Sequence, residues 1–187
     1  MSSGIPIIAI DTGVSGADVT SFVATDNYAV AKVQGAIAAT LVNDGDTVIY
    51  VTGNQAQSTG QERRNGFMEA FSAARPGSKI LEVPTEWNSQ QAQEGVEAVL
   101  NSNSDVKMVV NAWDGGTMGA KAALENLGYS AGDVKLVGFD GASDAIAAMD
   151  EGWVHADTAQ MLYQMGYQGI KAAAAAARGE TVSSRID

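Results

Sequence analysis

Short apolar runs alternate along the chain with longer segments in which apolar residues recur every three or four positions. The short runs, such as VIYV and KMVV, are rich in β-branched residues, which is typical of strands buried in a parallel sheet. The longer segments have the period of amphipathic helices. We therefore expect strands near 5–10, 47–52, 79–83, 106–110, 134–139 and 154–158, and helices near 27–42, 59–74, 89–102, 116–127, 142–150 and 161–178.

This regular alternation of strand and helix predicts an α/β fold with a doubly wound parallel sheet in three layers, α/β/α. Right-handed crossovers place the connecting helices on both faces of such a sheet. Asp26, Ser58 and Asn88 precede predicted helices, and their side chains can accept a hydrogen bond from the first helical turn. We expect these three residues to be N-caps.

The composition supports a folded protein and argues against several kinds of partner. The chain has 187 residues, of which 45% are hydrophobic, enough for one domain or one and a half. The net charge of −11 disfavours a nucleic-acid partner, since phosphates repel an acidic surface. With no cysteine and one histidine, the usual metal ligands are scarce, so we expect neither a metal nor a cofactor.

The chain shows no sign of export or membrane insertion in its own residues. Its N-terminus, MSSGIPIIAID, has no basic region and too short an apolar run for a signal peptide. No segment approaches transmembrane length. We expect no signal peptide in this chain and no membrane insertion.

The loops after the predicted strands are rich in polar and aromatic residues. Ligands of an open parallel sheet bind beyond the carboxyl ends of its strands, which is where these loops lie. Two of the loops contain Trp87 and Trp113. An indole face can cover the C–H face of a sugar ring while carboxylates and amides bind its hydroxyls, so this loop set favours a sugar site.

One loop, Trp113-Asp114-Gly115-Gly116, ends an apolar strand and is followed at once by a helical pattern. We expect its two glycines to let the backbone turn sharply into a helix that begins near Thr117. The loop would then form one side of a ligand cleft, with Trp113 offering its ring and Asp114 binding hydroxyls or capping the helix.

Six segments together resemble a known family: GIPIIAID, VATDN, QERRNGF, VVNAWDGGTMGAKAAL, KLVGFDGASDAIAAM and GWVHADTAQ. From end to end, the chain is similar to the ribose-binding-protein branch of type I periplasmic binding proteins. The resemblance implies two α/β lobes that close on a sugar, and a loaded form that docks on an ABC permease. It also implies a periplasmic or extracellular full-length protein.

By position, the resemblance implies ligand contacts for eight residues. Gln61 stands where the family often has a sugar-binding arginine, and Trp113 where asparagine is common. These departures favour a ligand bulkier or less polar than ribose, such as a hexose, a polyol or a deoxy sugar. The eight residues are Asp11, Thr12, Gln61, Trp87, Trp113, Asp114, Asp140 and Gln160.

Each of these residues also has a structural alternative. Trp87 and Trp113 suit packing at a lobe interface. Asp140 precedes a glycine and suits a turn, while Asp114 suits a helix N-cap. The two glutamines, Gln61 and Gln160, suit solvated or capping positions at helix starts.

The resemblance also predicts how the chain is divided. It assigns 1–22 to a remnant of the first lobe, 23–159 to the whole second lobe and 160–187 to a helix of the first lobe, ending just before the strand that would return there. We therefore expect a chain that carries mainly one lobe and exposes apolar residues that promote self-association, strand exchange or local disorder. These residues are Ile5, Ile7, Ile8, Ile10, Met161, Leu162, Met165 and Ile170.

Two other functions remain as alternatives. The effector-sensing domain of a lactose-repressor-like regulator has the same fold and motifs, although the acidic charge and the lack of a preceding helix-turn-helix in these residues disfavour it. An α/β enzyme is a remote alternative, because the chain has no G-x-S-x-G, P-loop or dinucleotide motif and only His155 for a catalytic triad. We expect no enzymatic activity.

Overall fold

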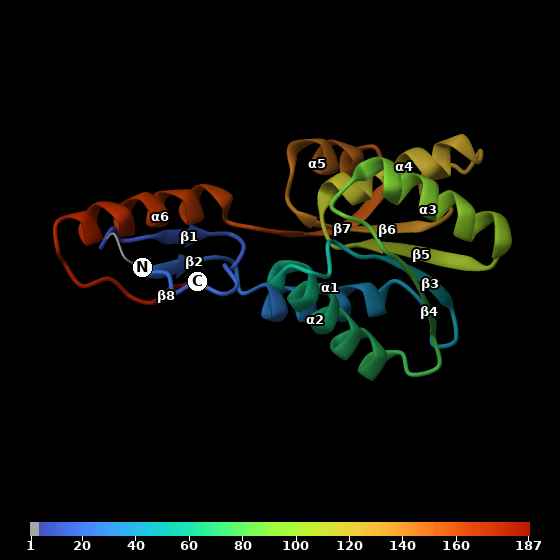
Figure 1. Cartoon of the computed structure of the whole chain (residues 1–187). Coiled ribbons are helices and arrows are strands. Elements are labelled where there is room, and N and C mark those ends of the chain that lie inside the picture. The colour runs from blue at the N-terminus through green and yellow to red at the C-terminus, as the bar shows by residue number, and fades with distance from the viewer. Residues whose placement is uncertain (1–3) are drawn as a thin grey trace.

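The computed structural model describes residues 4–187 and contains two sheets that lie side by side (Figure 1). We call the five-stranded sheet with α1–α5 the larger unit, and the three-stranded sheet with α6 the smaller unit. The elements in chain order are β1 (Ile8–Ile10), β2 (Ser21–Val23), α1 (Asn27–Thr40), β3 (Thr47–Val51), α2 (Ser58–Ala74), β4 (Lys79–Val83), α3 (Ser89–Ser102), β5 (Val106–Asn111), α4 (Asp114–Asn126), β6 (Lys135–Asp140), α5 (Ser143–Asp150), β7 (Val154–Ala159), α6 (Leu162–Ala177) and β8 (Arg185–Ile186).

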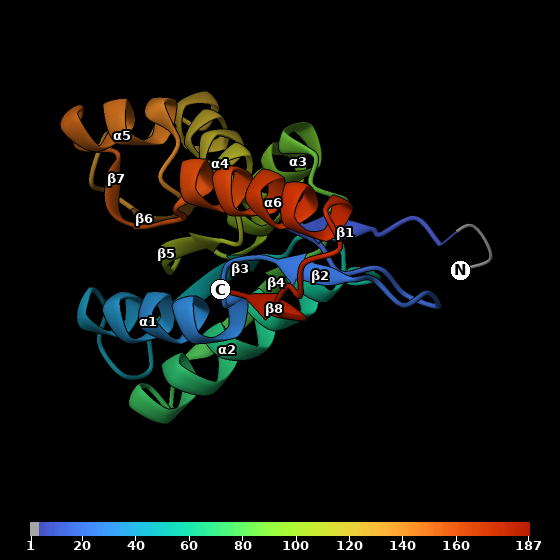
Figure 2. The ribbon, with the colours of Figure 1, turned by 90° about the vertical axis from the view of Figure 1, so that its left-hand side faces the viewer.

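The larger unit is the doubly wound parallel sheet that the sequence predicts. Its strands are all parallel and follow the order β4-β3-β5-β6-β7. Helices α1 and α2 cover one face and α3, α4 and α5 cover the other (Figures 1 and 2). The predicted three-layer α/β/α fold is therefore confirmed, and each predicted helix and strand of this unit is present.

The core of the larger unit lies on both faces of its central strands. Every residue of β3 is buried, because this strand has a neighbour on each side and helices above and below. The Tyr50 ring stacks on Phe67 of α2 with a centroid distance of 4.4 Å. Gly35 lets α1 approach α2 closely, since a Cβ there would lie 2.8 Å from the Phe67 carbonyl oxygen. This packing holds the strand ends in place.

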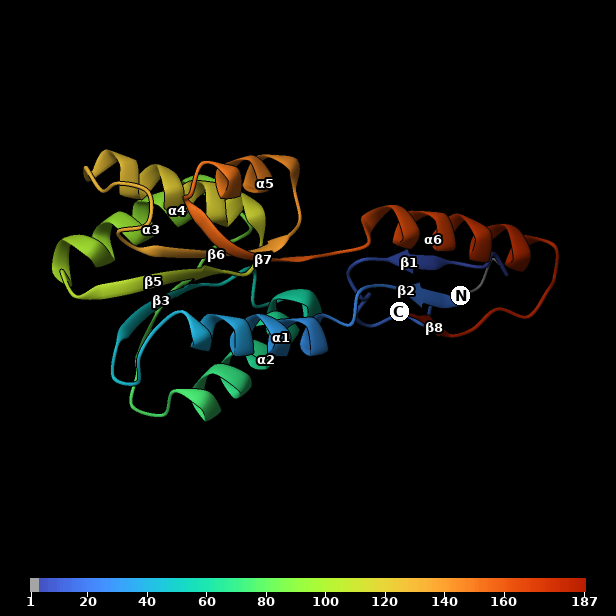
Figure 3. The same cartoon turned by 180° about the vertical axis from the view of Figure 1, so that it is seen from behind.

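The smaller unit contains two strands that the sequence does not predict. Its sheet has the order β1-β2-β8, and α6 covers one face (Figure 3). The expectation that the chain ends just before a strand is wrong, because Arg185 and Ile186 pair with Phe22 and Val23. Strands β2 and β8 have three and two residues, too few for a periodic pattern, and only pairing across the chain defines them. No helix within residues 4–187 is long and apolar enough to cross a membrane.

The helix starts agree with the sequence at two of the three predicted caps. Asp26 and Asn88 accept hydrogen bonds from the backbone N–H groups of Ala29 and Gln91. The Ser58 cap is wrong: Ser58 is already helical, and its hydroxyl accepts a hydrogen bond from the Gly13 N–H. The side chain thus connects α2 to the loop after β1.

The predicted turn at Gly115 and Gly116 is also wrong. Helix α4 begins at Asp114, so both glycines lie in its first turn, and neither has a positive φ. They leave room for an aromatic ring instead, because a Cβ on Gly116 would lie 2.7 Å from Cζ3 of Trp113. The absence of a side chain at these positions lets the Trp113 ring lie against the helix.

Candidate functional site

A hollow of about 410 Å³ lies beyond the carboxyl ends of strands from both sheets. Asp11 follows β1 and Trp87 follows β4, while Asp140 ends β6. Parallel strands end at a common edge, so residues far apart in the chain meet there. The hollow is lined by Asp11, Thr12, Gln57, Thr59, Arg63, Trp87, Trp113, Asp140 and Gln160.

The backbone around this hollow is strained. Within residues 4–187, three residues other than glycine have a positive φ: Asp11 at 72°, Trp87 at 60° and Asp140 at 131°. All three line the hollow. A side chain at positive φ costs free energy, and such residues persist mainly where a site requires them. This coincidence marks the hollow as the candidate functional site.

Two tryptophans form an aromatic wall of the hollow. The rings of Trp87 and Trp113 meet edge to face, with a centroid distance of 5.3 Å and an interplanar angle of 89°. The Trp87 indole N–H donates to Oε1 of Gln57 over 2.6 Å. Gly53 leaves the space that the far edge of the Trp87 ring occupies. The two rings are therefore held in fixed orientations before any ligand arrives.

A buried arginine organises the polar wall. Nη1 of Arg63 donates to Oδ1 of Asp140 over 3.0 Å and to the Ala112 carbonyl over 2.7 Å, and Nε donates to Oδ1 of Asn27 over 2.8 Å. The guanidinium also lies over the Phe139 ring, 4.0 Å from its centroid. Its side chain is only 3% exposed, so this charge is fixed by protein partners rather than by water.

Asp140 is the centre of the polar wall. Its Oδ1 also accepts a hydrogen bond of 2.6 Å from Nε2 of Gln160, and Oε1 of Gln160 in turn accepts from the Thr25 hydroxyl. Burial raises the pKa of Asp140 above its ordinary value, although the Arg63 charge and the Gln160 amide oppose that change. Oδ2 of Asp140 also accepts the Asp114 backbone N–H over 3.4 Å, so three donors orient the carboxylate, which keeps acceptor capacity for a ligand hydroxyl.

The loop after β1 closes the hollow from the smaller unit. The Thr12 hydroxyl donates to Oδ2 of Asp11 and lies 3.1 Å from the Thr59 hydroxyl. The contact with Thr59 connects the smaller unit to α2. Among residues 4–187 no group of three or more His, Cys, Asp or Glu side chains is arranged to hold a metal ion.

The structure brings six of the eight predicted site residues together. Gln61 and Asp114 do not line the hollow. Nε2 of Gln61 donates to the Gln55 carbonyl at an exposed position, while Asp114 is buried and its carboxylate accepts backbone N–H groups. Ligand contact remains a prediction for the six that meet: Asp11, Thr12, Trp87, Trp113, Asp140 and Gln160.

Gln57, Thr59 and Arg63 also line the hollow and were not among the predicted contacts. Thr59 and Arg63 are four residues apart on α2, so they share one face of the helix, whereas Gln61 points away from that face. That face continues into the buried Gly66 and Phe67. The helical spacing of Arg63 from the buried Gly66 and Phe67 is therefore the sequence signal that favours Arg63 over Gln61 as a site residue.

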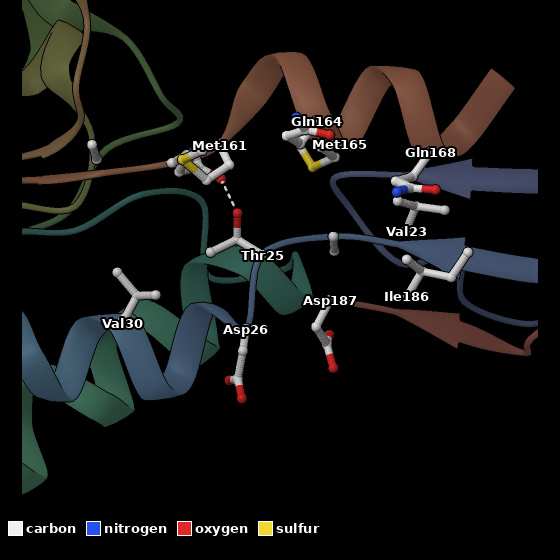
Figure 4. A pocket seen from close by; sticks show the side chains of 13 residues that line it. Val23, Thr25, Asp26, Val30, Met161, Gln164, Met165, Gln168, Ile186 and Asp187 are labelled. Atoms are coloured by element: carbon white, nitrogen blue, oxygen red, sulfur yellow. Dashed lines mark hydrogen bonds between the residues drawn. The ribbon is translucent and has the colours of Figure 1, made fainter. Parts of the chain in front are cut away.

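A second hollow of about 410 Å³ lies between α6, β2, β8 and the start of α1 (Figure 4). Val23, Val30, Met161, Met165 and Ile186 make much of its wall apolar. It contains neither a tryptophan nor an arginine, the groups that suit a ring with many hydroxyls. The first hollow is therefore the better candidate for a polar ligand.

We compared the chain with known protein families and proteins. The model of a periplasmic binding protein domain matches residues 1–181, almost the whole chain. The chain belongs to the periplasmic binding protein family. It is 31% identical over 183 residues to the ribose import binding protein RbsB of Escherichia coli (strain K12), an alignment that covers 98% of this chain and 61% of that protein.

Two further relatives extend the comparison. The chain is 34% identical over 158 residues to the D-allose-binding periplasmic protein of Escherichia coli (strain K12), covering 84% of this chain and 50% of that protein. A crystal structure of an ABC transporter periplasmic solute binding protein from Actinobacillus succinogenes 130z with bound D-allose superposes with a TM-score of 0.88 at 25% identity, covering 99% of this chain and 65% of that one. The family match confirms the type I periplasmic-binding-protein resemblance, and the chain spans about 60% of the length of the RbsB relatives.

Proposed function

We propose that this chain is the larger part of a substrate-binding component of an ABC transporter, and that it binds a sugar or polyol in the hollow between its two sheets. The observation that carries this proposal is the meeting of Asp11, Trp87 and Asp140, all at positive φ, on one hollow. The names of the relatives, which include ribose and D-allose binding proteins, support a sugar ligand and favour transport over the regulator alternative.

The wall residues have the chemistry that a sugar needs. Trp87 and Trp113 offer aromatic surface to C–H groups, and Asp11, Asp140 and Gln160 offer acceptors and donors to hydroxyls. Arg63 holds Asp140 in position, so the carboxylate does not have to be ordered when the ligand arrives.

The chain contains three tryptophans, which makes the proposal testable with this protein alone. D-Allose or D-ribose at about 50 mM, enough to load a millimolar site, should shift the indole N–H resonances of Trp87 and Trp113 in a saturable way. Trp153 packs against Lys121 and is outside the hollow, so its resonance is an internal control. Titrations with both sugars that leave Trp87 and Trp113 as unmoved as Trp153 would contradict the proposal.

Two variants sharpen this titration. Asp140→Asn removes the charge that faces Arg63 and should abolish the saturable shifts. Asp150→Asn makes the same chemical change at the exposed end of α5 and should leave them unaltered.

We further propose that ligand binding favours a closed arrangement of two lobes in the full-length protein, which acts in the periplasm or outside the cell and docks on an ABC permease. A ligand that contacts both walls binds the closed form better and so shifts the population toward it. Transport of the sugar by reconstituted permease, with and without the binding protein, tests the docking. We also propose that exposed apolar residues of the smaller unit, among them Met161 and Ile170, promote self-association.

A further inference from the structure

Two carboxyl groups meet behind the binding hollow with no cation between them. Asp114 begins α4, and Asp157 lies on β7 opposite Gly138 of the neighbouring strand β6. A Cβ on Gly138 would lie 2.6 Å from Oδ1 of Asp114 and 2.8 Å from Oδ2 of Asp157. The two oxygens therefore share the space that the glycine leaves open.

The two carboxyl groups differ in their hydrogen bonds. Asp114 accepts the Phe139 N–H at Oδ1 over 3.1 Å and the Ala142 N–H at Oδ2 over 2.7 Å. Both oxygens of Asp157 are buried and have no donor within hydrogen-bond geometry, although the nearby backbone N–H groups of Gly141 and Thr158 lower its pKa. A buried carboxylate without a donor is costly, whereas a protonated carboxyl can donate to an acceptor. Oδ1 of Asp114, which lies in the same space beside Gly138, is an acceptor for that proton.

The surroundings favour keeping one proton on the pair. Burial raises the pKa of Asp114 to about 7, and the neighbouring Asp157 carboxyl adds to this rise. Burial also raises the pKa of Asp157, while its interaction with Asp114 opposes that rise, so the proton resides more on the Asp114 side of the pair. Asp140 adds further negative potential to both groups. Arg63 on α2 pairs with Asp140. The other charged or titratable groups on α4, β6, α5 and β7 are Lys121 and Glu125 on α4, Lys135 on β6, Asp144 and Asp150 on α5, and His155 on β7.

We propose that Asp114 and Asp157 share a single proton, and that this proton positions the loop between β6 and α5. Asp114 binds the N–H of Phe139 on one side of Asp140 and that of Ala142 on the other, so its carboxyl sets the position of the loop that carries Asp140. Loss of the proton leaves two buried negative charges in contact, which repel each other and displace the loop. Asp114 and Asp157 are positioning residues, and only their effect on the ligand rests on the proposed sugar function.

The first test needs no ligand. Carbon-13 NMR of the carboxyl carbons follows Asp114 and Asp157 between pH 4 and 9, and the Ala142 amide N–H resonance reports the loop. We expect the two carboxyl signals to titrate together with a midpoint near pH 7, and the Ala142 amide to shift with the same midpoint. Midpoints below pH 5 for both carboxyls, or an Ala142 amide that does not follow them, would overturn the proposal.

Asp157→Asn supplies a second, independent readout. Asparagine donates an N–H to Asp114 at every pH, so the variant should lose the neutral-pH midpoint. In the unsubstituted protein (the parent), the shared proton gives its full stabilisation at a pH below about 4, the ordinary pKa of aspartate. This stabilisation is lost as the pH rises to about 7, the raised pKa of Asp114. The unfolding constant of the parent relative to Asp157→Asn should therefore rise about tenfold or more from pH 5 to pH 8.

Asp150→Asn is the matched control for that ratio, because it removes an exposed carboxyl from the end of α5. Its unfolding constant should follow that of the parent at both pH values. If the ratio of the unfolding constants of the parent and Asp157→Asn is also the same at pH 5 and pH 8, the proposal is overturned. Because no step of either test uses a sugar, failure of the sugar titration leaves this result unaffected, and the reverse also holds.

Discussion

The two units of this protein are built from the same kinds of element but differ in how completely their sheets are covered. In the larger unit, helices cover both faces of five strands, and most of the largest fully buried side chains, such as Tyr50, Phe67 and Phe139, lie there. In the smaller unit, α6 covers one face of three short strands (Figures 1 and 3). Several of its apolar residues are exposed, with Ile170 at 71%.

This difference shows where the folding free energy comes from. Burial of apolar surface is the dominant favourable contribution, and it scales with the area removed from water. The larger unit therefore has enough core to hold the binding walls that it contributes. The smaller unit provides one loop of the site, with Asp11 and Thr12. Hydrogen bonds from this loop to Ser58 and Thr59 of α2 connect it to the larger unit.

The largest expected effect compares one substitution in the two units. Ile49→Ala in β3 removes a side chain with no exposure and should lower the free energy of unfolding by about 2–5 kcal/mol. Ile170→Ala on α6 should change it by no more than about 0.5 kcal/mol, because the side chain is already in water. Urea denaturation of both variants measures this, and equal losses would contradict the difference in burial.

The next comparison uses glycines. Gly53→Ala places a methyl group in the space of the Trp87 ring, so it should cost about 1–3 kcal/mol and shift the Trp87 indole resonance. Gly166→Ala, within α6, meets no atom within 4 Å and should stabilise the protein by about 0.5–1 kcal/mol, since alanine favours a helix. Thermal unfolding measures both changes, and an unmoved Trp87 resonance in Gly53→Ala would show that the ring is not held there.

The smallest expected effect concerns self-association. If the smaller unit is the contact surface, Ile170→Ser should weaken self-association about fivefold, equivalent to roughly 1 kcal/mol. Ile146→Ser is the matched control on the larger unit, where α5 also exposes an isoleucine, at 44%. Light scattering over a range of concentrations measures the association, and a parent that stays monomeric at every concentration would contradict this role for the smaller unit.

Much of the fold follows from local patterns in the sequence. In the larger unit, apolar residues recur every three or four positions in the helices, and they alternate or form a continuous run in the strands. Each element can therefore be recognised within its own segment. The loops after the strands could be grouped for the same reason, because parallel strands bring their carboxyl ends to one edge. This is why six predicted site residues meet in one hollow.

The features whose surroundings differ from the prediction depend on contacts between residues that are distant in the chain, and no local pattern contains these contacts. The position relative to a motif favours Gln61, whereas the geometry of α2 directs Arg63 into the site, where it meets Asp140, 77 residues away. Gly115 and Gly116 have the composition of a turn, but the ring of Trp113 occupies the space beside them. In each case a neighbour brought by the fold determines what the residue does.

The sequence by itself determined the α/β class, the order of strands and helices in the larger unit and the chemistry of the loops, because hydrophobic periodicity and turn composition act over a few residues. The tertiary structure alone decided the pairing of β2 with β8, the orientation of Arg63 and the contact between Asp114 and Asp157. Strands β2 and β8 are too short to be stable without a partner, and a buried charge is defined by what surrounds it. Both depend on segments that are distant in the chain and adjacent only after folding.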